Sequence, residues 1–241
     1  MSDVGDIYEA QVAKAIFHDR HPARKYTHWP YRVAQVARRI KRLTGHSGKI
    51  LDIGCSNGLA LAAMGEGWEK NGVELCPATA EIARQFAGAQ VFCGAIENYS
   101  APENYFDVVT AFAVIEHVSD PVWLIQWAVS HLKTNGLLVI MTGDRESRIA
   151  QTMQDRWPLL LSPDHVSYFS ARSLTHLLQS SGLEVVHQEW RYVYSAIPEN
   201  GLCRTWKKVQ DLFGFNQSPV YDHYYCYAVK KTTDNIDRTQ A

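Results

Sequence analysis

The sequence predicts an α/β fold with a mostly parallel, doubly wound sheet that carries helices on both faces. Short apolar runs alternate with helix-like stretches, and right-handed crossovers turn this order into a parallel sheet. The runs are continuously apolar, which is typical of strands buried on both faces. The predicted strands are Lys49–Ile53, Asn71–Leu75, Gln90–Cys93, Phe106–Phe112 and Leu137–Thr142.

Helices are predicted from apolar periodicity and from capping residues. Over Tyr31–Leu43, apolar side chains recur at helical spacing and basic side chains occupy the opposite face. Asp120 and Ser170 each precede an apolar helical stretch as an N-cap, and Gly182 ends the second of these. The remaining predicted helices are Leu59–Glu66, Pro77–Ala87, Pro121 to about Lys133, and Ser170–Ser181.

Two long aromatic segments follow, Leu183–Tyr194 and Tyr221–Lys231, and their β-rich composition suits an antiparallel pair that closes the sheet. The 241 residues suffice for one large domain. We therefore expect an N-terminal cap segment over 1–30 and one domain over 31–231. Within that domain, 143–169 and 195–220 are expected to be irregular insertions around a substrate site. Residues 232–241 are expected to be a disordered tail.

Composition excludes several classes of protein. The net charge is −1, although the segment Lys14–Arg42 carries +8 and the rest of the chain −9. This basic segment is typical either of an anion-binding site or of a solvated helix face. Five scattered cysteines argue against a disulfide framework or a zinc site and favour reduced thiols in the cytoplasm. The start of the chain has no apolar signal region, and no apolar run is long enough to span a membrane.

The loop after the first predicted strand has the pattern Asp52-x-Gly54-x-x-x-Gly58. Ligands of open α/β sheets bind at the carboxyl ends of the strands, and glycines there allow a close approach to the backbone. Glu74, at the end of the next strand, is spaced to accept hydrogen bonds from a ribose diol. Ser56 stands where a dinucleotide fingerprint has its second glycine, which disfavours NAD and FAD. A cofactor with adenosine and no pyrophosphate fits better.

These segments resemble class I S-adenosylmethionine-dependent methyltransferases. Ile50–Gly58 resembles the first motif of that family, with Ser56 in place of a glycine, and Val73–Leu75 resembles the second. Phe112–Pro121 and Pro163–Ser170 are similar to the ubiquinone O-methyltransferase-like and biotin-synthesis-like group. The resemblance implies a Rossmann-like sheet of seven strands. It also implies S-adenosyl-L-methionine as the methyl donor and S-adenosyl-L-homocysteine as the product.

The resemblance also assigns cofactor roles to residues at the strand ends. It implies that Asp52, Gly54 and Gly58 contact the methionine part, that Glu74 holds the ribose and that Leu75 packs on the adenine. The family often has an acid near Ala95, and this chain does not, so the adenine amino group is left to backbone groups or Glu97. The residues implied in the cofactor site are Asp52, Gly54, Cys55, Ser56, Gly58, Glu74, Leu75, Ala95, Ile96, Ala111 and Phe112.

Two histidines are candidates for catalysis, His117 after the fourth strand and His165 in the first insertion. Either could be a general base or a structural group. Some relatives bind a divalent ion with the pattern E-x-x-E-H, but Ala113 replaces the first acid here and leaves Glu116-His117. Two ligands from one loop seldom hold Mg²⁺, so we predict no metal.

The sequence predicts a methyltransferase but does not identify the molecule that it methylates. We expect methylation of a small molecule, at oxygen or nitrogen rather than at carbon. The expected pocket walls are Trp157, Tyr168, Phe169 and Trp190. One alternative is an RNA or phosphorylated metabolite held by the basic segment, and nucleic acid is the less favoured partner. Another alternative is a non-catalytic module that binds the cofactor or a partner. The sequence leaves the oligomeric state open.

Overall fold

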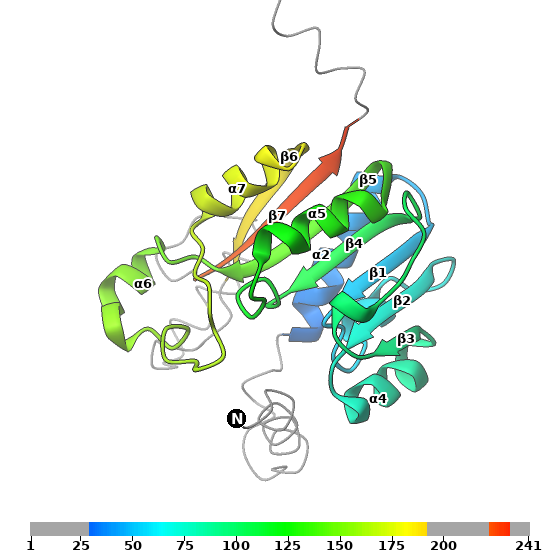
Figure 1. Ribbon diagram of the computed structural model, residues 1–241, viewed down its shortest axis with the longest axis horizontal. Helices are drawn as coiled ribbons and strands as arrows, with labels where there is room; N and C mark the ends of the chain where they lie inside the picture. The colour runs from blue at the N-terminus through cyan, green and yellow to red at the C-terminus, as the bar shows by residue number, and fades with distance from the viewer. Residues whose placement is uncertain (1–28, 192–221, 232–241) are drawn as a thin grey trace, which may run out of the picture.

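The structure is a computed structural model, and it describes residues 29–191 and 222–231 (Figure 1). Within these residues one seven-stranded sheet has the order β3-β2-β1-β4-β5-β7-β6. This confirms the predicted fold class. The strands are β1 Lys49–Ile53, β2 Glu69–Glu74, β3 Gln90–Cys93, β4 Phe106–Phe112, β5 Leu132–Gly143, β6 Leu183–Arg191 and β7 His223–Lys230.

The first five strands are parallel, with β1 paired to both β2 and β4. The order of the strands therefore reverses at β1, which is where such sheets bind ligands. Strand β7 is antiparallel to β5 and to β6 and lies between them. The expected antiparallel pair is thus present, and its second strand lies inside the sheet rather than at its edge.

Helices cover both faces of the sheet (Figure 1). Helices α2, α3 and α4 supply side chains to one buried apolar cluster, and α5 and α7 supply them to the cluster on the other face. Helix α6 belongs to the first insertion and stands beside the sheet (Figure 1). The helices are α2 Trp29–Thr44, α3 Leu59–Ala63, α4 Pro77–Ala87, α5 Pro121–His131, α6 Arg148–Met153 and α7 Ala171–Ser180, with 3-10 turns η1 Ile96–Asn98 and η2 Gln154–Arg156.

Several boundaries differ from the predictions, and β2, for example, runs over Glu69–Glu74 instead of Asn71–Leu75. Helix α3 ends at Ala63 and not at Glu66, because Gly65 takes a left-handed conformation with a φ of 73°. Helix α5 ends at His131 because the fully buried Leu132 pairs with Phe106 and begins β5. The predicted turn at Asn135 is a left-handed residue within that strand, beside a register shift. The insertion 143–169 is also less irregular than expected, since it contains α6 and η2.

The predictions for most of 1–30, for 195–220 and for the tail 232–241 lie outside the described residues. Among the helices that the structure describes, none combines the length and the apolar character that a membrane span requires.

Candidate functional site

The loop after β1 has left-handed conformations at three alternate positions, with φ values of 70° at Gly54, 47° at Ser56 and 77° at Gly58. A Cβ atom on Gly54 would lie 2.5 Å from Val114 Cγ2, and one on Gly58 would lie 3.0 Å from Ala83 Cα. Both positions therefore require glycine. Ser56 adopts the left-handed conformation at a cost of about 1–2 kcal/mol, which a glycine would avoid.

Glu74 lies at the end of β2 and is 2% exposed. One carboxylate oxygen accepts a hydrogen bond from the Ser56 N–H at 2.8 Å, and the other accepts one from the Cys76 N–H at 2.9 Å. Glu74 is thus a support of the glycine loop rather than a solvated strand end. A carboxylate oxygen can accept more than one hydrogen bond, so both oxygens keep capacity for ligand hydroxyls.

Asp52 is also buried, and its Oδ1 accepts a hydrogen bond from the Thr110 hydroxyl at 2.6 Å. Desolvation raises the pKa of Asp52 to about 7, and the charge of Glu74 adds to this effect while the Thr110 bond opposes it. Two acidic side chains therefore sit close together below the loop. Such a pair favours a ligand that brings a positive charge.

The other predicted cofactor residues divide into exposed and buried ones. Leu75 is 55% exposed beside Glu74 and offers an apolar surface to a flat ring. Cys55 is buried, burial raises the pKa of its thiol, and a Cβ on Gly72 would lie 2.6 Å from its sulfur. This agrees with a space-filling role. Ile96 and Ala111 are buried in the core, whereas Ala95 and Phe112 are half-buried.

The loop after β4 passes next to the glycine loop, because Val114 covers Gly54. Glu116 in this loop is 3% exposed, and its carboxylate accepts a hydrogen bond from the Thr142 hydroxyl at 2.9 Å. The main-chain oxygen of Glu116 accepts hydrogen bonds from the N–H groups of Val166 and Ser167. Glu116 therefore fastens the first insertion to the β4 loop.

The structure brings the two candidate histidines together. The rings of His117 and His165 meet edge to face, with centroids 4.6 Å apart. His117 Nδ1 hydrogen bonds to the main-chain oxygen of Asp164 at 3.1 Å and lies 3.2 Å from Asp164 Oδ2. His165 Nδ1 hydrogen bonds to the main-chain oxygen of Leu159 at 2.8 Å. These partners only accept, so each ring carries its proton on Nδ1 when neutral and its lone pair on Nε2.

Glu116, His117 and His165 each offer one ligand atom, and these atoms lie within 4.8 Å of one another. Two imidazoles and a carboxylate have the composition of a divalent-metal site. The sequence prediction of no metal counted the two ligands of the β4 loop, and the fold adds His165 as a third. The absence of a metal stays a prediction, which a chelator experiment tests below.

Four residues of the site were not among the predicted site residues: Asp164, Thr110, Thr142 and Val114. Only the two threonines gave a signal, as polar residues within apolar strands. Of the expected pocket walls, Trp157 and Phe169 are buried, and they line a cavity of about 10 Å³ next to Glu116. Trp190 is half-buried, and its indole N–H donates to Asp144 at 2.9 Å. Tyr168 is 37% exposed, so it alone of the four presents much surface to a ligand.

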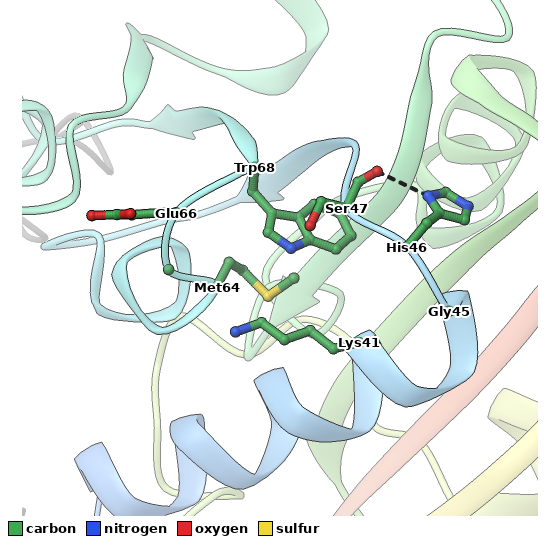
Figure 2. A pocket seen from close by; sticks show the side chains of 8 residues that line it. Lys41, Gly45, His46, Ser47, Met64, Glu66 and Trp68 are labelled. Atoms are coloured by element: carbon green, nitrogen blue, oxygen red, sulfur yellow. Dashed lines mark hydrogen bonds between the residues drawn. The ribbon is translucent and has the colours of Figure 1, made fainter.

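A second hollow, of about 320 Å³, lies where β1 and β2 begin (Figure 2). It lies at the amino ends of these parallel strands, whereas the glycine loop lies at their carboxyl ends. Lys41 lines this hollow, and its Nζ is 3.4 Å from the Ala63 main-chain oxygen. The Nδ1 atom of His46 hydrogen bonds to the main-chain oxygen of Ser47 (Figure 2). None of the predicted site residues lines it, so it is separate from the candidate site.

The seven-stranded sheet, the glycine loop and the spaced acid are those of the class I S-adenosylmethionine-dependent methyltransferase fold. The chain matches the methyltransferase domain family over residues 24–188, more than half of its length, and it belongs to that family.

A curated relative is the ubiquinone biosynthesis O-methyltransferase of Idiomarina loihiensis, which is 36% identical over 104 residues. That match covers 40% of this chain and 43% of the relative, so the chain spans about half the length of the curated relatives it matches.

Solved structures share the fold. A SAM-dependent methyltransferase of Thermotoga maritima, described as a possible histamine N-methyltransferase, has a TM-score of 0.61 at 22% identity. The alignment covers 94% of this chain and 99% of that one. Geranyl diphosphate C-methyltransferase of Streptomyces coelicolor, solved with S-adenosyl-L-homocysteine, has a TM-score of 0.57 at 13% identity and covers 88% and 86% of the two chains.

Proposed function

We propose that this enzyme methylates an oxygen atom of a small-molecule acceptor and that His117 receives the acceptor's proton. The observation that carries the proposal is the contact of the two loops, since Val114 of the β4 loop covers Gly54 of the glycine loop. His117 is three residues further along this loop, which supports a position of the histidine pair near the glycine loop. The names of the curated relatives support oxygen over nitrogen as the methylated atom.

The residues of the cradle fit the cofactor. When bound, S-adenosylmethionine supplies a methyl group activated by a positively charged sulfur. Asp52 would receive the ammonium group of the methionine part, and the free lone pairs of Glu74 would accept the ribose hydroxyls. Leu75 would pack on the adenine. The loop of Gly54 and Gly58 leaves room for a backbone approach that any side chain would block.

In this reaction the protein would position the cofactor and the acceptor, and it would take up the proton of the acceptor hydroxyl. Positioning of two reactants contributes about 7–11 kcal/mol to such reactions. Nε2 of His117 would accept the proton of the acceptor hydroxyl, and His165 would pack against the ring and restrict its motion. A hydroxyl with a high pKa needs such a base more than an amine does.

The proposal is tested by incubating the protein with methyl-labelled S-adenosylmethionine and a metabolite extract, followed by mass spectrometry. We expect the label in a small molecule as a methyl ether. Label in an RNA pool, with binding that weakens steeply as salt is added, would support the alternative of an RNA acceptor held by the basic segment. Binding of the cofactor without any transfer would support the non-catalytic alternative.

The pKa of Asp52 predicts how cofactor binding depends on pH. In the free protein this carboxyl has a pKa of about 7 because of desolvation, and the cofactor's ammonium group would favour its charged form. Binding below pH 7 must then release a proton, so the dissociation constant should rise by about tenfold from pH 8 to pH 6. Calorimetric titration at both pH values checks this. An Asp52→Asn variant should bind weakly with no such change, and a flat profile in the unmodified protein contradicts the prediction.

Removal of divalent ions should leave methyl transfer unchanged. Glu116, His117 and His165 already form hydrogen bonds with Thr142, Asp164 and Leu159. In addition, Ala113 stands where the metal-binding pattern E-x-x-E-H has its first acid. Initial rates before and after dialysis against EDTA provide the measurement. A loss of rate that Mg²⁺ or Mn²⁺ restores would instead assign a metal to the three side chains.

A further inference from the structure

We propose that Asp164 is a positioning residue, which fixes the tautomer and orientation of His117 so that Nε2 carries the lone pair at the site. The inference rests on the proposed function for its effect on the rate. Its structural part stands on the contacts of the insertion alone. Asp164 touches neither cofactor nor acceptor in this account and acts through His117.

Two oxygen atoms of Asp164 face the same ring nitrogen. The main-chain oxygen is 3.1 Å and Oδ2 is 3.2 Å from His117 Nδ1. Both atoms can only accept a hydrogen bond, so they stabilise the tautomer with its proton on Nδ1. The same arrangement of a carboxylate behind a histidine orients the proton acceptor in hydrolase triads.

Asp164 is itself held in place. The Ser162 hydroxyl donates to Asp164 Oδ1 at 2.5 Å, which leaves Oδ2 for the histidine. The turn is closed by the His165 N–H, which donates to the Ser162 main-chain oxygen at 3.2 Å. Desolvation raises the pKa of Asp164, but the Ser162 bond and the adjacent histidines outweigh this and lower it overall. The carboxylate is therefore charged at neutral pH.

Hydrogen bonds join the turn that contains Asp164 to the β4 loop that carries His117. The N–H groups of Val166 and Ser167 donate to the main-chain oxygen of Glu116, the residue before His117. His165, the residue after Asp164, packs its ring edge to face on His117. The insertion and the β4 loop thus form one unit in which Asp164 and His117 face each other. The side chains of Asp164 and His117 are 27% and 32% exposed, so an ion pair between them would add little to stability.

A role in loop stability alone predicts a different outcome from a role through His117, and a double-mutant cycle separates them. The rate of methyl transfer from labelled S-adenosylmethionine to a fixed metabolite extract is measured for four full-length proteins. These are the unmodified chain, Asp164→Ala, His117→Ala and the double variant. We expect Asp164→Ala to lower the rate by about tenfold, the lower end of the loss seen when the carboxylate behind a metal-binding histidine is removed, with unchanged affinity for S-adenosylmethionine. In the His117→Ala background the same substitution should change the rate by less than about twofold.

Two further variants sharpen the cycle. Asp164→Asn keeps an oxygen acceptor and should retain more activity than Asp164→Ala. Asp155→Asn removes an exposed acid of the same insertion and should behave like the unmodified protein. An equal loss in both His117 backgrounds would overturn the proposal.

Nitrogen-15 NMR of the imidazoles supplies a readout that needs no acceptor. His117 of the unmodified protein should show the tautomer with the proton on Nδ1, and Asp164→Ala should move part of the population to the other tautomer. A proton on Nε2 of His117 in the unmodified protein would overturn the proposal. If no methyl transfer occurs at all, the proposed function fails, and the NMR result still decides whether Asp164 sets the tautomer.

Discussion

Replacing Glu74 with alanine should weaken binding of S-adenosylmethionine by at least about a hundredfold. The variant loses a charged acceptor for the ribose hydroxyls, and each such hydrogen bond contributes about 1.5–3 kcal/mol. It also leaves the N–H groups of Ser56 and Cys76 without their acceptor, so the glycine loop loses its support. Calorimetric titration gives the affinity, and thermal unfolding should show a lower Tm.

A matched control lies on the same strand. Glu69 begins β2, at the far end from the cradle, where it pairs with Lys49 on the surface. Glu69→Ala should therefore leave the affinity unchanged. A Glu74→Ala variant that folds and binds the cofactor as the unmodified protein does would remove Glu74 from the cofactor site.

Replacing His117 with alanine should lower the rate of methyl transfer by about 10²–10³-fold, within the range for loss of a general base. Its affinity for S-adenosylmethionine should not change, because the ring lies on the β4 loop and not among the groups that hold the cofactor. His46→Ala is a suitable control, since His46 precedes β1 and lies at the amino ends of the strands, whereas the candidate site lies at their carboxyl ends. An unchanged rate in the His117 variant would leave His117 with the structural role of joining the β4 loop to the insertion.

The strands that place the site were predictable because their boundaries are local. Strands β1, β3 and β4 and helix α4 match the predicted ranges, since apolar runs and flanking glycine, proline or polar residues mark their ends. The start of β5 was not predictable in this way. Leu132 continues a helical pattern in the sequence, and only its burial against Phe106 in the fold turns it into a strand residue.

The candidate site shows the same division. Asp52 and Glu74 follow from the positions of strand ends, which the sequence determines through spacing. The pairing of His117 with Asp164 and His165 depends on an insertion that folds back through the Glu116 main-chain oxygen. Main-chain hydrogen bonds of this kind leave no pattern in residue types. The third potential metal donor and the positioning carboxylate therefore appear only in three dimensions.

The most direct test of the cofactor site is calorimetric titration with S-adenosylmethionine and S-adenosylhomocysteine. We expect one molecule to bind per chain, the two compounds to compete, and binding to weaken below pH 7 as Asp52 takes up a proton. Failure of both compounds to bind at millimolar concentration would contradict the assignment of Asp52, Glu74 and the glycine loop to the cofactor.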